Sequence, residues 1–440
     1  MALRIIERMI HDGRSNPQPR RARRLPQRTA GVAGLSLLLL ARGPLAGAEQ
    51  EMPRGVVVET VICATDPSQS YALYLPTTFR PDRRWPTILV LDPRGRGAVA
   101  AELFRPAAER FGFVLLSSYG TQSDGPEGSD ANRLALKALA DELPRHAVDP
   151  ARIYLAGFSG TARIAWAVAA GSQGGIAGVI GAGGALPGPF AEWKHVTFPF
   201  FGTAGMADFN HDELRTLDGL LDGVALPHRI EFFEGGHSWP SAALLEEALG
   251  WLETKAMQRG LRPVDPALAE SLYKAGLAEA RRREAAGNPF DARRRYQGLA
   301  EDFLGLLDTA EAATARRRLA RDPLAAAQER ALARAGREEA TFRDVQLAAM
   351  ARRLRESGDR PIGAERILSD LKVERLARAA AEPTEAGRSA RRRLVAAAIH
   401  LGFYLPRELD AAGLPLRAEA ARKAAAEIQL AIEASDPPES

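Results

Sequence analysis

The stretch that most limits how this chain can fold is a glycine–serine turn directly after a short apolar run. Residues 153–161 read Ile-Tyr-Leu-Ala-Gly-Phe-Ser-Gly-Thr. A strand that ends in Gly-x-Ser-x-small and continues into a helix is typical of a nucleophile elbow. This turn strains the serine backbone and holds its hydroxyl out above the sheet edge. Ser159 is therefore a candidate nucleophile, although Thr161 stands where the pattern usually has glycine. The alternative is an ordinary strand-to-helix turn with a capping serine.

A serine hydroxyl is a weak nucleophile unless a base and an orienting acid assist it. After an elbow of this kind the acid and then the histidine follow along the chain, on loops after later strands. Asp208 lies in the loop after the apolar run 196–201, and His237 follows a glycine pair after the strand-like run 228–233. We therefore predict Ser159 as nucleophile, Asp208 as acid and His237 as base.

Another histidine close to Asp208 is a rival for the role of base. His211 falls where a helix over 211–221 should begin, so the alternative interpretation is a solvated residue of a first helical turn. The remaining candidates considered lie in strand edges or helices without a comparable context: His195, His228 and His400. We predict neither a metal site nor a cofactor.

Negative charge that develops on a substrate carbonyl oxygen needs hydrogen-bond donors. The backbone amide of Gly160, directly after Ser159, is the first predicted donor. The second is expected from the loop after the buried strand 87–91, where Arg94 or Gly95 would present an amide. A simple glycine-rich turn is the alternative for that loop.

Several motifs in the same order resemble the α/β-hydrolase superfamily, and more narrowly esterases and dienelactone-hydrolase-like or depolymerase-like proteins. The resemblance covers about residues 54–259. The motifs that carry it are 70–76, 85–87, 92–95, 157–160, 205–210 and 235–240. The resemblance implies hydrolysis of carboxylic esters, with substrates that vary widely. Because a fold alone does not establish an activity, the prediction depends on Ser159, Asp208 and His237.

The first 48 residues have the composition of a signal peptide. Arginines precede an apolar stretch over 31–41, and the small residues Ala46 and Ala48 frame a cleavage pattern. This arrangement predicts export to the periplasm or outside the cell. A disordered basic arm or an uncleaved membrane anchor is the alternative. No later apolar run reaches the roughly 18 residues that cross a bilayer, so no membrane span is expected after cleavage.

The basic isoelectric point comes from this N-terminal segment. Residues 1–48 hold nine arginines and two acidic residues, a net charge of +7, whereas the whole chain carries +4, which leaves about −3 for the rest. We therefore predict no nucleic-acid partner. Cys63 is the single cysteine, so no internal disulfide can form, and a small buried strand residue is expected there.

Strand and helix patterns alternate over residues 49–260. Residues 56–62 and 70–75 are predicted to open the sheet as an antiparallel pair, and the later strands alternate with helices. Such alternation predicts a doubly wound, mostly parallel sheet with helices on both faces, followed by a second domain. Because active-site loops then share the carboxyl edge of the strands, the three catalytic candidates are expected to meet there.

Residues 261–440 lack strand patterns and are rich in Ala, Leu, Arg and Glu at helical spacing. The predicted helices are 268–286, 291–304, 309–319, 323–335, 338–357, 362–380, 384–401 and 406–434. Two stretches, 286–296 and 411–421, resemble parts of degenerate tetratricopeptide repeats, in which small residues let paired helices stack closely. The arginine clusters of this region are interpreted as solvated helix faces rather than as a groove for an anionic ligand.

Two functions from different classes follow. The first is an exported serine hydrolase that cleaves carboxylic esters, with peptidase and depolymerase activities as variants. The second is a catalytically degenerate hydrolase scaffold whose helical region binds a protein partner. In the first case the helical region would gate or position the ester substrate. We expect residues from about 49 to 260 to fold without the rest and to keep most turnover of a small ester.

Overall fold

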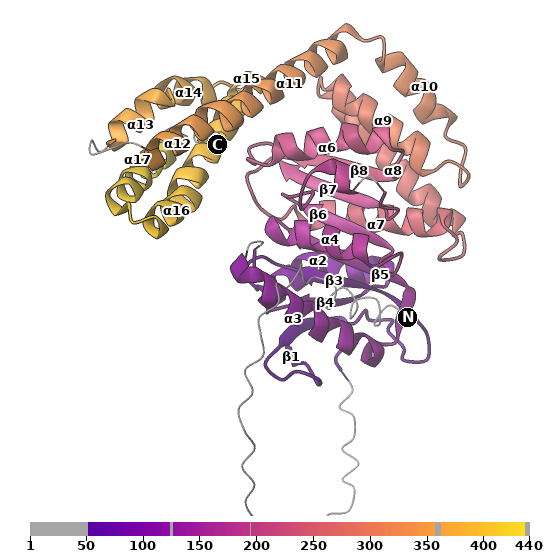
Figure 1. The fold of residues 1–440 in the computed structure, drawn as a ribbon. Coiled ribbons are helices and arrows are strands. Elements are labelled where there is room, and N and C mark those ends of the chain that lie inside the picture. Colours follow the sequence, from indigo (N-terminus) through magenta and orange to yellow (C-terminus); the bar gives the residue numbers. More distant parts are fainter. Residues whose placement is uncertain (1–51, 124–125, 194, 357–361, 436–440) are drawn as a thin grey trace, which may run out of the picture.

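A computed structural model describes residues 52–123, 126–193, 195–356 and 362–435 (Figure 1). The predicted signal peptide, residues 1–48, lies outside the described residues. The first part of the described chain forms an eight-stranded sheet with helices on both faces, which we call the sheet half. The second part contains only helices and is called the helical half. Within the described ranges, no helix is both long and apolar enough to cross a bilayer.

The sheet is mostly parallel, as the sequence predicts. Its strand order is β1-β2-β4-β3-β5-β6-β7-β8. The pairs β1–β2 and β2–β4 are antiparallel, and the other pairs are parallel. The strands are β1 (Val57–Ile62), β2 (Ser70–Tyr74), β3 (Trp85–Leu91), β4 (Val114–Ser118), β5 (Val148–Phe158), β6 (Gly178–Ala182), β7 (Phe200–Gly205) and β8 (His228–Phe233).

Helices cover both faces because the central strands are apolar on both sides. Along β3, Ile88 and Val90 join one hydrophobic cluster with residues of α2 and α7, whereas Leu89 and Leu91 join another with residues of α4 and α6. This division follows the two-residue repeat of a strand. The helices of this half are α2 (Gly97–Phe111), α3 (Pro126–Glu142), α4 (Gly160–Gly171), α5 (Phe190–Trp193), α6 (His211–Gly223) and α7 (Ala242–Gln258).

The register of the parallel strands brings their carboxyl ends to one edge. Leu91 of β3 lies opposite Gly157 of β5, and Phe158 lies opposite Ala182 of β6. Ala182 in turn lies opposite Thr203 of β7. The loops that follow these strands therefore emerge side by side, and the elbow lies between the loop after β3 and the loop after β6.

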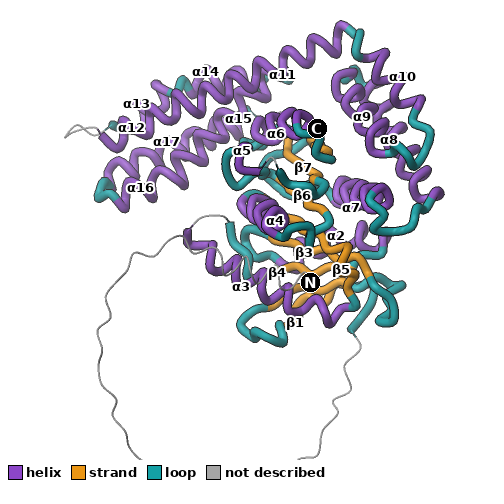
Figure 2. Tube along the Cα trace, turned by 45° about the vertical axis from the view of Figure 1, so that its right-hand side comes forward, coloured by secondary structure: helices purple, strands orange, loops and turns teal. Residues whose placement is uncertain are grey.

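The helical half forms two packed groups joined by α11 (Figures 1 and 2). The first group packs around Tyr273, Tyr296 and Leu299, and the second around Phe342, Leu394 and Ile428. The helices are α8 (Pro266–Ala285), α9 (Pro289–Asp302), α10 (Ala310–Leu319), α11 (Pro323–Thr341), α12 (Ala348–Glu356), α13 (Ala364–Asp370), α14 (Val373–Ala380), α15 (Glu385–Ile399), α16 (Leu405–Ala411) and α17 (Pro415–Ala434).

Some helix boundaries differ from those expected from the sequence. The expected break between 335 and 338 is absent, because α11 continues through the π-helical segment Phe342–Leu347 into α12. The expected helix 362–380 is interrupted at Lys372, whose backbone is left-handed (φ 55°). The last expected helix begins later, because α15 continues through a second π-helical segment into α16 and Gly413 (φ 75°) ends that run.

Candidate active site

The elbow at the end of β5 has the strained geometry that its sequence predicts. Ser159 adopts φ 55° and ψ −126°, a combination that costs a residue other than glycine roughly 1–3 kcal/mol. A side chain at position 157 would place its Cβ only 2.3 Å from the carbonyl oxygen of Thr161. Glycine at 157 is therefore required for α4 to start this close to β5. The sequence interpretation as an elbow agrees with this backbone.

Thr161 fits the elbow despite its departure from the usual pattern. Its buried hydroxyl lies 2.5 Å from the carbonyl oxygen of Leu91 and 2.8 Å from that of Phe158, and it accepts a hydrogen bond from the Phe158 N–H at 3.0 Å. The hydroxyl can donate to one of those carbonyls at a time. The side chain thereby connects the elbow to the end of β3, which supports the turn.

The three predicted catalytic side chains lie in one hydrogen-bonded chain. The Oγ of Ser159 is 2.9 Å from Nε2 of His237, and Nδ1 of His237 is 2.9 Å from Oδ1 and 3.0 Å from Oδ2 of Asp208. Asp208 is fully buried, whereas the His237 side chain is 22% exposed. This arrangement can remove a proton from the Ser159 hydroxyl and hold the resulting imidazolium beside a carboxylate.

The loop after β7 fixes the position of Asp208. The Oδ1 of Asp208 accepts a hydrogen bond from the Asn210 N–H at 2.8 Å. The Asn210 side chain donates to the carbonyl of Gly183 in the loop after β6, at 2.7 Å. The ring of His237 contacts Phe158 and Phe209, with centroids 4.7 and 4.4 Å away. These neighbours restrict the carboxylate and the imidazole to the geometry that faces Ser159.

The predicted oxyanion donors have different surroundings. Gly160 begins α4 directly after Ser159, as expected. The N–H of Arg94 donates to Oδ1 of Asp92 at 2.9 Å, and the N–H of Gly95 donates to the Asp92 carbonyl at 3.0 Å. Either amide would have to leave this bond before it could stabilise an oxyanion. The role of Arg94 and Gly95 thus stays a prediction that the turn, as it is folded here, does not favour.

Asp92 is a residue near the site to which sequence reasoning gave no role. It is fully buried at the end of β3, and its carboxylate accepts hydrogen bonds from Arg96 and from the indole of Trp239, at 2.8 and 2.9 Å. Burial would raise the pKa of Asp92, but the hydrogen bonds from Arg96, Trp239 and the Arg94 N–H lower it overall. Because Trp239 is two residues beyond His237, this bond connects the histidine loop to β3. A carboxylate directly after an apolar strand could have indicated such a partner.

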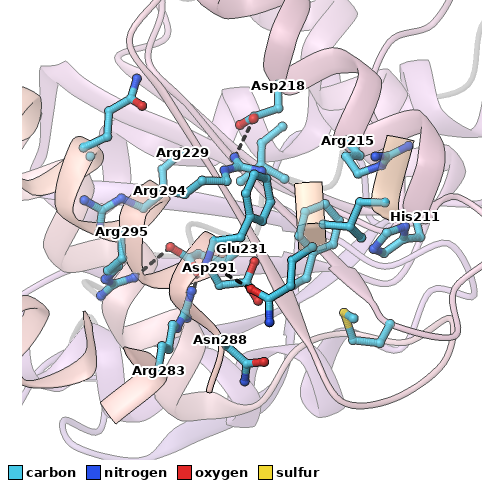
Figure 3. Close-up of a pocket in the computed structure, with 18 of the residues that line it drawn as sticks. His211, Arg215, Asp218, Arg229, Glu231, Arg283, Asn288, Asp291, Arg294 and Arg295 are labelled. Carbon is cyan, nitrogen blue, oxygen red and sulfur yellow. Dashed lines mark hydrogen bonds and ion pairs between the residues drawn. The ribbon is translucent and has the colours of Figure 1, made fainter. Parts of the chain in front are cut away.

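His211, the rival base, is not placed for that role. It is 2% exposed and contacts Phe232, with ring centroids 4.4 Å apart. Burial, with smaller contributions from the charges of Arg392, Arg215 and Arg388, lowers its pKa to about 2. The expectation of a solvated first-turn residue is therefore wrong. His211 is a buried neutral residue on the wall of a cavity of about 750 Å³, beside Arg215 (Figure 3).

That cavity is lined mainly by charged residues from both halves, and neither Ser159 nor His237 lines it. Its centre holds Glu231 of β8 with Arg283 of α8 and Arg295 of α9 (Figure 3), at 2.9 and 2.7 Å. Burial alone would raise the pKa of Glu231, but the two arginines lower it to about 2. This cluster joins the two halves and is separate from the Ser159–His237–Asp208 chain.

Three carboxylate and imidazole groups at the α6–β8 edge lie close enough to share a cation. They belong to Asp218, Asp222 and His228. Asp218 already forms an ion pair with Arg294 at 2.5 Å, and Nε2 of His228 is 3.4 Å from Oδ1 of Asp218. Although burial lowers the pKa of His228, hydrogen bonds and the two carboxylates raise it overall, which fits an ion-paired histidine.

Neither a protein-family model nor a curated protein matches the sequence. Solved structures similar to part of the chain include those of serine hydrolases and esterases. The fluorophosphonate-binding serine hydrolase F of Staphylococcus aureus is 12% identical, with a TM-score of 0.35, over 42% of this chain and 92% of its own. A ferulic acid esterase is 14% identical (TM-score 0.37; 46% and 97% covered). Thermogutta terrifontis esterase 2 is 16% identical (TM-score 0.34; 47% and 96% covered).

These TM-scores lie below 0.5, so we assign the fold from this chain's own strand order and connections. The sheet is mostly parallel with an antiparallel β2, the helices cover both faces, and the strained serine turn follows β5. The sheet half has the α/β-hydrolase fold. An all-helical region follows it, as expected from the sequence.

Proposed function

We propose that the protein is a serine hydrolase that cleaves carboxylic esters, with Ser159 as nucleophile, His237 as base and Asp208 as the acid that orients it. The observation that carries the proposal is the hydrogen-bonded chain from Ser159 Oγ through both ring nitrogens of His237 to Asp208. The strained backbone at the same serine supports the proposal, because residues with such strain cluster at active sites. No cofactor is needed for this chemistry.

In the proposed mechanism, Ser159 Oγ attacks the ester carbonyl carbon while His237 Nε2 takes the hydroxyl proton. The oxyanion that forms is stabilised by the Gly160 amide. As the bond from the carbonyl carbon to the alcohol oxygen breaks, His237 gives its proton to the departing alcohol. Water then attacks the acyl-enzyme with His237 again as base, which releases the acid and restores Ser159. The buried carboxylate of Asp208 stabilises the imidazolium each time His237 carries the extra proton.

Peptidase and depolymerase activities are variants of the same chemistry. We further propose export by the first 48 residues, on the strength of their composition alone. The degenerate-scaffold alternative is less well supported, because a scaffold has no need of a strained serine bonded to a histidine–aspartate pair. A protein partner for the helical half has no observation in its favour, and the contacts of that half with the sheet half support a role close to the site.

A fluorophosphonate probe tests the proposal directly. The protein without residues 1–48 is expected to become covalently labelled and to hydrolyse p-nitrophenyl acetate. Ser159→Ala should abolish labelling and lower turnover by at least about a thousandfold, because triad members act as a unit. His237→Ala should cost as much, and Asp208→Asn somewhat less.

Circular dichroism and thermal unfolding serve as controls for folding in each variant. Turnover of the Ser159→Ala protein near the wild-type rate would remove the basis for the proposed activity. A loss with His211→Phe as large as that with His237→Ala would show that the base is wrongly assigned.

A further inference from the structure

A second cavity, of about 740 Å³, lies between the two halves. From the sheet half it is lined by residues of α4, α5, α6 and the loops after β6 and β7. From the helical half it is lined by residues of α11, α12, α15 and the two π-helical segments. Apolar side chains contribute from both sides, among them Leu186, Phe190, Leu217, Phe342, Leu347 and Ala351. The volume lies within the range of sites that bind drug-sized molecules, and such sites are mostly apolar.

Neither Ser159 nor His237 lines this cavity, but one residue of its wall contacts the catalytic histidine. Phe209 lines the cavity, and its ring is the one whose centroid lies 4.4 Å from that of His237. Asn210, which fixes Asp208, lines it as well, and so does Arg163 on the first turn of α4 after Ser159. Phe209 is therefore in contact with the catalytic imidazole and also forms part of the wall of a cavity large enough for a bulky group, lined by apolar and charged side chains.

The position beside His237 indicates which part of an ester would enter. His237 must give its proton to the departing alcohol oxygen, so the alcohol part of the ester leaves on the side of Ser159 where the imidazole lies. From the structure we infer that this interdomain cavity binds the alcohol part of the substrate, and that the substrate is an ester of a bulky aromatic or polycyclic alcohol. This inference rests on the proposed ester hydrolysis. It makes the helical half one wall of the substrate site.

Acetate esters of graded alcohol size test the inference, with ethyl acetate as the smallest and 1-naphthyl acetate as the largest. Ala348→Trp fills the cavity from α12, where the native alanine is exposed, and Leu220→Trp fills it from α6. Each substitution should lower kcat/KM for 1-naphthyl acetate at least about tenfold, because even one methylene group in an apolar pocket changes discrimination by about 10- to 200-fold. Turnover of ethyl acetate, whose alcohol part is too small to fill the cavity, should fall much less, so the ratio of the two kcat/KM values is the quantity that decides.

Ala331→Trp is the matched control, because this exposed alanine lines the other interdomain cavity. It should leave the preference for 1-naphthyl acetate unchanged. Equal losses with all three variants, or no loss with Ala348→Trp and Leu220→Trp, would overturn the inference. A loss confined to p-nitrophenyl esters with long acyl chains would also overturn it, since the cavity would then hold the acyl chain.

Binding of 1-naphthol, followed by its fluorescence, separates this inference from the proposed function. The Ser159→Ala protein should bind 1-naphthol, and adding Ala348→Trp should weaken binding at least about tenfold. If this result were obtained but no ester were hydrolysed by the wild-type protein, the proposed activity would fail while the cavity remained a site for aromatic alcohols. If esters were hydrolysed but 1-naphthol binding did not respond to Ala348→Trp, the inference would fail alone.

Discussion

Ser159 faces His237 because its neighbours leave the backbone no relaxed alternative. Gly157 lets α4 begin against β5, and the Thr161 hydroxyl connects the turn to the end of β3. On the other side, a Cβ at Gly184 would lie 2.5 Å from the Ser159 carbonyl oxygen. The strain is therefore concentrated at one residue and is sustained by contacts from three separate strands and their loops.

The buried neutral state of His211 predicts a dependence of stability on pH. Its pKa in the folded protein is about 2, well below the value of about 6.5 for an unfolded chain. As the pH falls below about 6.5, the unfolded chain takes up a proton that the folded protein does not, so stability is lost on acidification. His211→Phe should remove this contribution, and the loss between pH 7.5 and 5 should shrink by about 2 kcal/mol.

Urea unfolding at the two pH values measures this difference. Phe232→Leu is the control, because it disturbs the same packing without removing the titrating ring. Its unfolding free energy should fall at both pH values, with the pH dependence retained. An unchanged pH dependence in His211→Phe would show that His211 gains its proton as readily in the folded protein as in the unfolded chain.

Among the secondary-structure elements, α15 has a direct connection to the catalytic loop after β7. Arg392 is 2% exposed, forms ion pairs with Glu339 of α11 and Glu385 of its own helix, and donates to the carbonyl of Met206 at 2.8 Å. Met206 lies two residues before Asp208. The helical half therefore contacts the loop that carries the predicted acid, and we predict that Arg392 is a positioning residue in the proposed reaction.

A double substitution tests this support without leaving a buried charge unpaired. Arg392→Met with Glu339→Met replaces both charges by apolar side chains, an exchange that is often neutral for stability. Glu385 keeps its ion pair with Arg388. The double variant should fold, but kcat for p-nitrophenyl acetate should drop roughly tenfold with KM little changed, because small displacements of catalytic groups are costly.

The rate of fluorophosphonate labelling should drop in parallel, since it needs the same base. The control is Arg353→Met on α12, which removes an ion pair with Asp370 of α13 and should leave kcat unchanged. An unaltered kcat in a stable double variant would mean that the Met206 contact does not position Asp208.

At the scale of the whole molecule, buried ion pairs connect residues on the two sides of the boundary near residue 260. Glu231 of β8 meets Arg283 and Arg295, and Asp302 of α9 meets Lys255 of α7 at 2.7 Å and Arg229 of β8. The sequence led us to expect that residues up to about 260 would fold and work alone. These contacts change that expectation, because truncation there would remove the partners of several buried groups at once.

Two truncations separate the contributions of the helical groups. A chain of residues 52–322 keeps α8 to α10, so the partners of Glu231 remain, and it should fold. It loses Arg392 and one wall of the 740 Å³ cavity, so its kcat/KM for p-nitrophenyl acetate should fall at least about tenfold. A chain of residues 52–260 should also be less stable than the longer one in thermal unfolding. Turnover of p-nitrophenyl acetate by either truncated chain at the rate of the complete protein would contradict the proposed role of the helical half.

Much of the sheet half and the candidate site could be predicted from the sequence. The strand and helix periods, the glycine–serine turn and the order of Ser159, Asp208 and His237 are local patterns, and the parallel topology brings their loops to one edge. Local patterns also misled at particular positions. The break predicted between 335 and 338 falls at Gly336, yet a glycine costs a helix only about 1 kcal/mol. In the structure α11 continues through this glycine, and a Cβ there would meet the ends of the Arg215 and Asp212 side chains of α6.

How the two halves combine depends on packing that no local pattern predicts. The amides of Arg94 and Gly95 are held by Asp92, Trp239 reaches that carboxylate from the histidine loop, and Arg392 reaches the loop of Asp208 from α15. Each of these contacts joins groups whose pairing depends on packing rather than on a repeat in the sequence. The candidate catalytic residues could be chosen from local sequence patterns alone, because the turn and the strands depend on short-range backbone geometry. The contacts around those residues depend on long-range packing, because polar groups that packing buries must form hydrogen bonds, here with groups from distant segments.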